Sequence, residues 1–304
     1  MQGELEWCEE HPAYQSPART AVETLLCLLV FVSYVPQDLS IVAHGTRAIS
    51  SRFVLFHSLS STMTLALRLC HPVFYSAFNC VDGGPYTGWK AYSALLGVIQ
   101  AAVQFIASMI LLALYAAHRT PPTADEPVEY PEPGVPSTVI KTTVGTVAVT
   151  VITVSLAFLW CNQFPYFDQD DPGTLGRYTA VYIVGLGLWM CLLVPANLAA
   201  VVLQFVYQLR TAHELHSQGA LSLVSLLMQA IALVSLAVAQ TLRSRSGIMW
   251  VGPPWHSIQR FLEMWVAFVS TINTQLAYLL VGLGFLALFI AVLLDRRSTG
   301  RITL

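Results

Sequence analysis

The sequence predicts an all-α integral membrane protein with seven transmembrane helices, arranged as two parallel three-helix bundles joined by a linker helix (3+1+3). Three observations lead to this fold class: the composition, seven apolar stretches, and an internal repeat. Only 11% of the 304 residues are charged, against roughly 25% in soluble domains. This deficit indicates a membrane protein. The formal net charge of −2 provides no basic field for nucleic acid, so no nucleic-acid partner is expected.

A helix needs about 20 mostly apolar residues to span a bilayer. Five stretches meet this condition without a charged residue, and two more contain embedded charges, namely Glu23 and Asp38 in the first and Arg68 in the second. In chain order, the seven predicted spans are 21–43, 53–78, 92–117, 142–162, 178–209, 220–242 and 264–294. The lipid bilayer is therefore the first expected partner.

These spans divide the chain into six segments. Between the third and fourth spans, residues 121–136 contain six prolines and four acidic residues, which is typical of a solvated connector without a core. The segments are an acidic N-terminus (1–20), a first bundle (21–118), the connector (119–137), the linker helix (138–162), a second bundle (177–294) and a basic tail (295–304).

The distribution of Lys and Arg favours a non-cytosolic N-terminus and a cytosolic C-terminus. With that orientation, eight of these residues lie in inner segments and six in outer segments, in the direction of the positive-inside bias.

The six cysteines fall into two groups. Cys27 and Cys191 lie within spans and are expected to be small apolar fillers. The other four cysteines fall on or near the outer side: Cys8, Cys70, Cys80 and Cys161. Two disulfides, Cys8–Cys80 and Cys70–Cys80, are candidates there. Spacing alone does not assign the pairs.

An internal repeat relates the first three spans to the last three. The segment SYVPQDLSIVAHGTRAISSRFVLF, from Ser33, parallels QFVYQLRTAHELHSQGALSLVSLL, from Gln204. Gln37 matches Gln208, and Pro36 matches Tyr207. Each segment then reaches a small residue, an apolar residue and a serine, at positions 48–50 and 220–222. Both copies face the membrane the same way, as in secondary transporters whose site lies between parallel repeats near the midplane.

The motifs SYVPQ and AIS, with the polar loop between them, resemble the PQ-loop repeat family, which includes cystinosin, the vacuolar basic amino-acid exporters and, more distantly, the SWEET sugar transporters. Residues 50–59 and 97–105 look most like fungal members of unassigned substrate. The resemblance implies alternating access in a vacuolar, lysosomal or other endomembrane, with the proline as a hinge. The second motif departs from the family pattern, because Tyr207 stands in place of the proline.

Polar residues inside the spans form stripes along single helix faces. The second span has one at His57, Ser61, Thr64 and Arg68, and the third has Gln100 and Gln104 one turn apart. The later spans carry Asn197, Gln204 and Gln208, then Ser222, Ser225 and Gln229, and finally Thr271, Asn273 and Gln275. Such stripes indicate either a solvated cavity or hydrogen bonds between helices, worth about 0.6 kcal/mol each.

The resulting site hypothesis gives each group of residues a role in moving a small polar solute, for instance an amino acid. The hinge and gate are Pro36, Gln37, Tyr207 and Gln208, and the solute contacts are Gln100, Gln104, Asn197, Asn273 and His57. Asp38 is the candidate for coupling to protons or another cation, and an interfacial helix end is its alternative. His57 is also open to a purely structural, hydrogen-bonded role.

Two other charged residues are ambiguous at this stage. Glu23 lies about one turn into the first span, which predicts a place at the outer interface. Arg68 either snorkels outward or offers a fixed positive charge to an anionic solute.

Enzyme-like patterns are weak, and no catalytic residue, metal site or cofactor is expected. Residues 168–171, DQDD, match the D-x-D-D pattern of terpene cyclases, but an acidic loop explains them better. His213 and His216 lack further zinc ligands nearby. Two other functions stay open: an intramembrane enzyme acting on a hydrophobic metabolite, such as a terpene cyclase, and a non-transporting receptor or scaffold. A homo-oligomer is also open.

Overall fold

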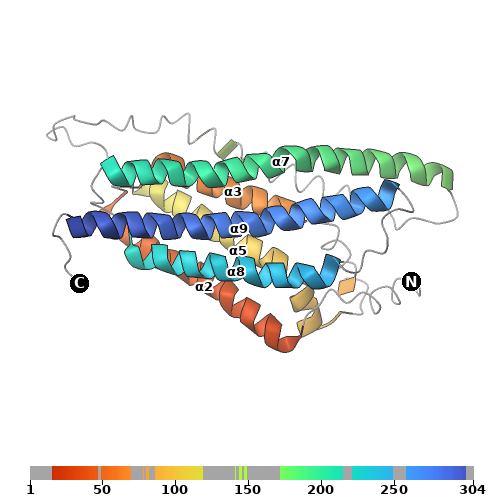
Figure 1. Cartoon of the computed structure of the whole chain (residues 1–304), viewed down its shortest axis with the longest axis horizontal. Helices are drawn as coiled ribbons and strands as arrows, with labels where there is room; N and C mark the ends of the chain where they lie inside the picture. The colour runs from red at the N-terminus through yellow and green to blue at the C-terminus, as the bar shows by residue number, and fades with distance from the viewer. Residues whose placement is uncertain are drawn as a thin grey trace.

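The computed structural model describes residues 16–46, 49–69, 86–118, 172–214, 221–248 and 258–298, with isolated positions between 78 and 81 and between 141 and 148. Within these residues the fold is all-α and contains no strand. The helices are α2 (Pro17–His44), α3 (Ser51–Leu69), α5 (Trp89–Ala117), α7 (Pro172–Glu214), α8 (Leu223–Ile248) and α9 (Ile258–Ser298). The helices α7, α8 and α9 run close to the long axis of the molecule, and α2 crosses it obliquely (Figure 1).

Five of the described helices are long and apolar enough to cross a membrane, which identifies a multi-pass membrane protein. The qualifying segments are Pro17–His44, Trp89–Ala117, Leu192–Glu214, Leu223–Leu242 and Ile272–Asp295. The predicted fourth span, 142–162, lies almost wholly outside the described residues, as do the connector and both chain ends. The seven-helix 3+1+3 order therefore stays a prediction.

The helix α3 is not apolar enough to qualify, although the sequence predicts a span there. It carries many serine and threonine side chains, and most of its residues are buried. It packs against α5, α7 and α9, so protein rather than lipid surrounds much of its surface. Hydrogen-bonding side chains are tolerated at such a position because neighbouring helices supply partners.

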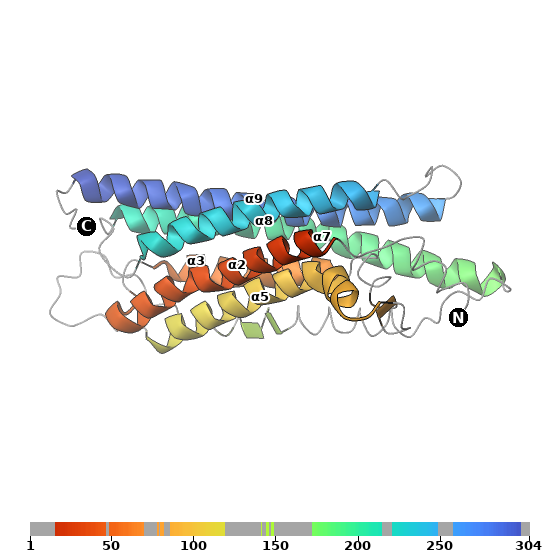
Figure 2. The same cartoon turned by 90° about the horizontal axis from the view of Figure 1, so that it is seen from below.

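The six described helices form a closed ring in which each packs mainly against two neighbours, and α3 also touches α9. Around the ring the order is α2, α8, α9, α7, α3 and α5, and α5 closes it on α2. The first triplet comprises α2, α3 and α5, and the second comprises α7, α8 and α9. In both, the third helix lies between the first and second. Figure 2 shows the two triplets as separate layers.

The contacts between the triplets are reciprocal. They run mainly through α2 with α8 and through α7 with α3, so exchanging the triplets interchanges these two main contacts. The arrangement has approximate twofold symmetry, as expected when two related halves face the membrane the same way.

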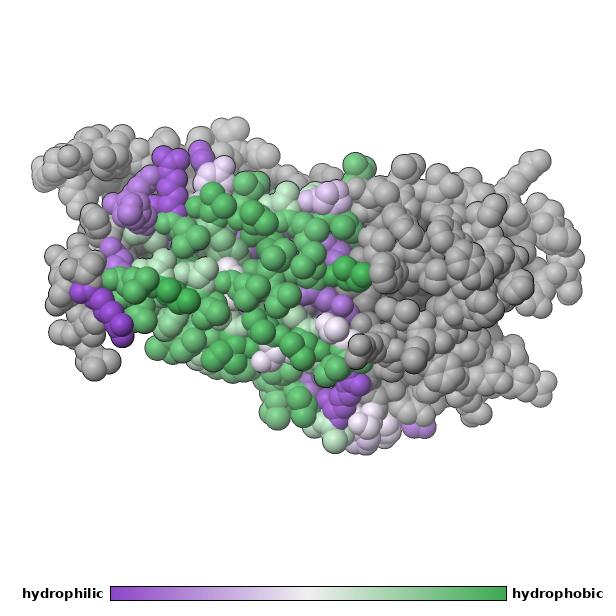
Figure 3. Space-filling model, viewed as in Figure 1, coloured by the Kyte–Doolittle hydropathy of each residue, from purple (hydrophilic) through white to green (hydrophobic). Residues whose placement is uncertain are grey.

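Apolar side chains fill the ring and also cover its outside. Tyr34, Leu233 and Tyr278 are among the fully buried residues of the core, whereas Leu25 and Leu192 are two-thirds exposed. Figure 3 shows apolar residues gathered over the middle of one face, with hydrophilic ones at its left-hand end. An exposed apolar surface of this kind is suited to contact with lipid chains.

The two ends of the ring differ, and we name them by their main features. At the glutamine end α3 and α8 begin, close to Gln37 and Gln208. At the disulfide end α2 and α5 begin, and Cys80 lies there. Cys80 is disulfide-bonded, and its partner is not among the described side chains. Among the described cysteines, Cys27 is free and buried. Cys8, Cys70 and Cys161 lie outside the described residues.

Several helix boundaries differ from the predicted ones. The hinge hypothesis supposes that Pro36 breaks the first helix. In the structure, α2 continues through Pro36 to His44. It ends at Gly45, whose φ of 75° favours glycine. Both α2 and α7 begin earlier than predicted, at Pro17 and Pro172, because proline suits the first turn of a helix, where its missing N–H costs nothing.

The close approach of α8 and α9 at Gly282 yields a testable prediction. A Cβ atom at Gly282 would lie 2.7 Å from Val234 Cγ2 and 3.0 Å from the Val234 backbone nitrogen. We expect Gly282→Ala to destabilise the protein by about 1–3 kcal/mol through overpacking, lowering the apparent melting temperature in detergent by several degrees. Gly145→Ala is the control, because no described atom lies within 4 Å of that Cβ. Equal melting temperatures for the two variants would contradict the close packing.

Candidate functional site

The two repeat glutamines cap helices of the opposite triplet. Gln208 Oε1, on α7, accepts the backbone N–H of Ser50 at 2.9 Å, at the start of α3. Gln37 Oε1, on α2, accepts the N–H of Ser222 at 3.0 Å, at the start of α8. In an ordinary capping box, a Glu or Gln of the same helix performs this function. Here the glutamine comes from another helix, so each cap also joins the two triplets.

A second contact lies one turn away, where Pro36 interrupts the hydrogen bonding of α2. Proline has no N–H to donate to the preceding turn. Nearby, the Ser33 carbonyl accepts the Ser225 hydroxyl at 2.5 Å and Gln229 Nε2 at 3.5 Å, both from α8. A neighbouring helix thus supplies donors beside the proline, which is how broken helices are tolerated in membranes.

The corresponding position on α7 is held differently. The Tyr207 ring stacks on Phe56 of α3, with centroids 5.8 Å apart, and the Arg52 guanidinium lies 4.8 Å from the Tyr207 centroid. Asp38, two residues after Pro36, is half-buried, and its Oδ1 has no hydrogen-bond partner among the described residues. The proline, tyrosine and aspartate of the site hypothesis therefore all lie at the glutamine end.

His57 is buried and bonded at both ring nitrogens. Tyr34 Oη lies 2.7 Å from Nε2, and Gln204 Oε1 lies 3.0 Å from Nδ1. An amide oxygen only accepts, so Nδ1 carries the hydrogen and the Tyr34 hydroxyl donates to Nε2. Phe53 stacks on the imidazole, and Phe285 contacts it edge-on. This arrangement fits a neutral, structural histidine, the second of the two predicted roles.

In the middle of the ring, Asn197 joins α7 to α3. Its Oδ1 accepts the Ser60 hydroxyl at 2.8 Å, and its Nδ2 donates to Thr64 Oγ1 at 3.3 Å. The hydroxyls of Ser61 and Ser108 bond α3 to α5. The polar stripe on α3 therefore makes hydrogen bonds between helices in this conformation.

A polar network at the disulfide end connects both triplets. Arg68 Nη2, on α3, donates to Gln240 Oε1, on α8. Gln240 Nε2 donates to Gln100 Oε1, on α5, at 3.0 Å, and Gln100 Nε2 donates to the Glu23 carbonyl, on α2, at 3.3 Å. Gln275 Nε2, on α9, donates to the Gln240 carbonyl at 3.3 Å.

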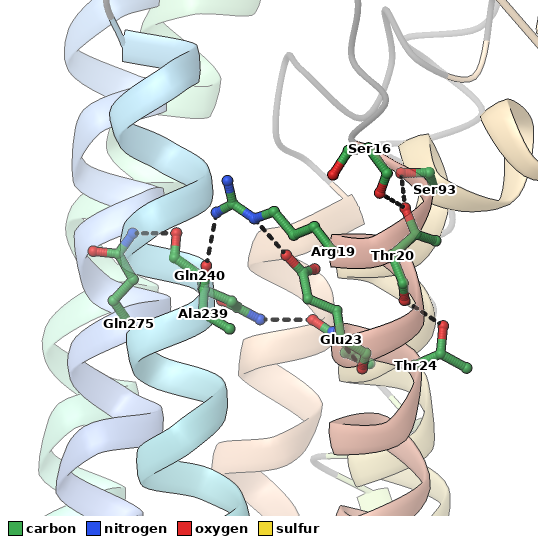
Figure 4. Close-up of polar contacts among 10 residues, drawn as sticks. Ser16, Arg19, Thr20, Glu23, Thr24, Ser93, Ala239, Gln240 and Gln275 are labelled. Carbon is green, nitrogen blue, oxygen red and sulfur yellow. Dashed lines mark hydrogen bonds and ion pairs between the residues drawn. The ribbon is translucent and has the colours of Figure 1, made fainter.

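Arg19 and Glu23 complete this network (Figure 4). Arg19 Nε lies 3.5 Å from Glu23 Oε1, and Arg19 Nη2 donates to the Ala239 carbonyl at 3.3 Å. The Glu23 side chain is only 1% exposed, so it points into the protein and not toward the interface, contrary to the prediction. Arg68 does not snorkel outward, because its guanidinium contacts Gln240 inside the ring.

The remaining predicted solute contacts are buried near this network or along the same helices. Gln104 Oε1 and both polar side-chain atoms of Asn273 meet no hydrogen-bond partner among the described residues, and the two residues are at most 4% exposed. The side chain of Thr271, residues 168–171 and His216 lie outside the described part.

Sequence reasoning missed Tyr34, the Ser33 carbonyl and Gln240. Tyr34 and Ser33 fall within the repeat segment, but nothing in their residue type marks them as contacts. The sequence does carry a signal for Gln240, because it lies within a predicted apolar span, where a glutamine is costly unless it is hydrogen-bonded.

The described residues thus define a multi-pass, all-helical membrane protein whose polar side chains are concentrated between two helix triplets. No family model, curated protein or solved structure matches this chain.

The reciprocal caps can be tested by replacing each glutamine with methionine, which has a similar length but cannot accept the N–H. We expect Gln37→Met and Gln208→Met each to lower stability by about 1–3 kcal/mol, because the partly buried N–H of Ser222 or the buried N–H of Ser50 loses its acceptor. Thermal unfolding of the purified protein in detergent measures the effect. Leu39→Met is the control, since Leu39 is 63% exposed on α2. Variants as stable as the control would show that the caps contribute nothing.

Proposed function

We propose that this protein transports a small polar solute by alternating access between the α2–α3–α5 and α7–α8–α9 triplets. The observation that carries the proposal is the set of polar contacts between the triplets, present at both ends of a ring with approximate twofold symmetry. Water or solute can replace such hydrogen bonds when one end opens. Secondary transporters built from parallel repeats place their site between the halves.

Membership of the PQ-loop family is part of this proposal. The caps give a physical reason for two elements of the resemblance, the glutamine and the serine that begins the next helix. Gln37 bonds the start of α8, and Gln208 bonds the start of α3. A gate at the glutamine end would open when both of these bonds break.

Pro36 is the proposed hinge of that gate, and Tyr207 is its less flexible counterpart. Pro36 leaves α2 with one hydrogen bond fewer, while the Tyr207 ring contacts both Phe56 and Arg52. Asp38 adjoins the gate and is the proposed group for proton or cation coupling. Gln100, Gln104, Asn197 and Asn273 are the proposed solute contacts, and Gln104 and Asn273 have buried atoms available for new hydrogen bonds.

The proposed orientation places the disulfide end in the lumen of an endomembrane compartment and the basic tail in the cytosol. Disulfides persist in oxidising compartments, and Cys80 is disulfide-bonded. The excess of Lys and Arg on the opposite side agrees with this orientation.

The proposal predicts saturable solute flux. The full chain, reconstituted in sealed vesicles, is assayed for uptake and efflux of amino acids and sugars, with protein-free vesicles as the background. We expect saturable flux of at least one of these solutes. Intact, reconstituted protein without flux of any of them would count decisively against transport.

The hinge hypothesis predicts unequal effects of two alanine substitutions at matched repeat positions. We expect Pro36→Ala to lower the flux more than Tyr207→Ala, because alanine restores the missing N–H and stiffens α2. Both variants are compared at equal amounts of folded protein, verified by size-exclusion chromatography. Equal or reversed effects would remove the hinge hypothesis.

A further inference from the structure

The side-chain amide of Gln240 lies between two groups of the opposite triplet, and each contacts a different end of it. Arg68 donates to its oxygen, and its nitrogen donates to Gln100 Oε1 at 3.0 Å. Gln240 is 2% exposed and Gln100 1%. The first triplet thus presents a cationic donor and a neutral acceptor, separated by the width of one amide group.

A carboxylate with a hydrogen-bond donor on the adjacent carbon presents the same pair of functions as this amide. The carboxylate would accept from the Arg68 guanidinium, in a charge-assisted bond that is stronger than a bond to a neutral amide. The neighbouring ammonium or hydroxyl would donate to Gln100 Oε1. Both α-amino acids and α-hydroxy acids meet this description, whereas sugars and simple amines lack the carboxylate.

The position of Gln240 in the repeat supports its role as a displaceable group. Arg68 and Gln240 lie equally far after Ser50 and Ser222, the capped serines that begin α3 and α8. They are equivalent residues that meet where the two triplets face each other. Separation of the triplets at the disulfide end removes Gln240 from Arg68 and Gln100 and leaves both facing the opening.

The surrounding charges suit a solute that carries a negative group. Glu23 is buried beside Gln100 and forms an ion pair with Arg19 (Figure 4). With Arg68 bonded to Gln240, a carboxylate and two guanidinium groups belong to the same polar network. A carboxylate brought to Arg68 would meet a guanidinium where it binds. For an ammonium, the network supplies the carboxylate of Glu23, the residue whose backbone carbonyl accepts from Gln100. Burying either charge without a partner would be strongly unfavourable.

We propose that the head group of an α-amino or α-hydroxy carboxylate replaces the Gln240 amide between Arg68 and Gln100. This assignment of the solute class rests on the proposed function, because it places the solute between the moving triplets. Arg68 is then the residue that determines specificity for the carboxylate, and Gln240 is a competing occupant of the solute's place.

The first test uses two sets of matched probes on the purified full chain. One set is L-alanine, L-lactate, propionate and ethylamine, and the other is L-phenylalanine, L-phenyllactate, 3-phenylpropionate and phenethylamine. Thermal stabilisation in detergent measures binding. We expect the α-amino acid, the α-hydroxy acid or both to bind in at least one set, at least tenfold more tightly than the acid without the donor and the amine without the carboxylate. Comparing the α-amino acid with the α-hydroxy acid of the same set shows whether the site prefers an ammonium or a hydroxyl. Binding of none of these acids, or equal binding of the truncated probes, would overturn the proposal.

The second test uses variants with the best probe. We expect Arg68→Gln to weaken binding at least tenfold, Arg68→Lys to retain part of it, and Gln240→Ala to tighten it several-fold, because the competing amide is gone. Arg210→Gln is the matched control, since Arg210 is exposed and paired with Glu214 at the other end of the ring. Weaker binding by Gln240→Ala, or unchanged binding by Arg68→Gln, would refute the replacement. Should Arg68→Gln not fold, Arg68→Lys and the matched probes still decide.

These readouts separate the two proposals. Flux of sugars alone, unaffected by Arg68→Gln, would overturn the solute class and leave transport intact. Carboxylate binding without any flux would overturn transport and leave the binding site intact.

Discussion

The reciprocal bonds from Gln37 to Ser222 and from Gln208 to Ser50 are the constraint on which the rest of the structure depends. A backbone N–H enclosed in a membrane protein must find an acceptor, because no water replaces it. The second helix of each triplet, α3 or α8, begins after a serine, Ser50 or Ser222. The N–H of each serine obtains its acceptor from the first helix of the other triplet. Neither triplet therefore completes its own helix start, and the ring closes only with both present. The same requirement sets the register between α2 and α8 and between α7 and α3.

Once that register is set, other polar contacts form at equivalent repeat positions of the two halves. One to two turns from the caps, Gln229 meets the Ser33 carbonyl, and His57 meets Gln204 at the equivalent place in the other half. The chemical groups differ, but the helix positions correspond. The bonds along α3 also explain how so polar a helix is accommodated: Asn197 and Ser108 supply partners from α7 and α5, so its hydroxyls need not face lipid.

How much of this was predictable depends on whether a feature is local in the sequence. Five apolar spans, the all-α class and the correspondence of Gln37 with Gln208 follow from composition, length and repeat, all of which are read along the chain. The partners of these glutamines were not predictable, because the repeat shows which residues are equivalent but not that they bond across the halves. Glu23 was misplaced, and the choice between the two alternatives for Arg68 was left open, for a related reason. Hydropathy locates a charge along a span, whereas its direction around the helix depends on neighbours such as Arg19 and Gln240. The polar sequence of α3 likewise becomes understandable only from its position between other helices.

The departures from symmetry carry the functional argument further than the symmetry does. Equivalent caps hold both sides of the glutamine end, whereas the contacts between the triplets at the opposite end are unequal. There, Arg68 meets Gln240, its own counterpart. Two arginines at these positions would repel each other, and two glutamines would satisfy each other without any charge. One of each places a neutral amide against the Arg68 guanidinium, and a neutral amide is a weaker hydrogen-bond acceptor for a cation than a carboxylate. In the proposed alternating-access cycle, a contact between the triplets that an anionic group could improve is better suited to exchange than to permanent closure.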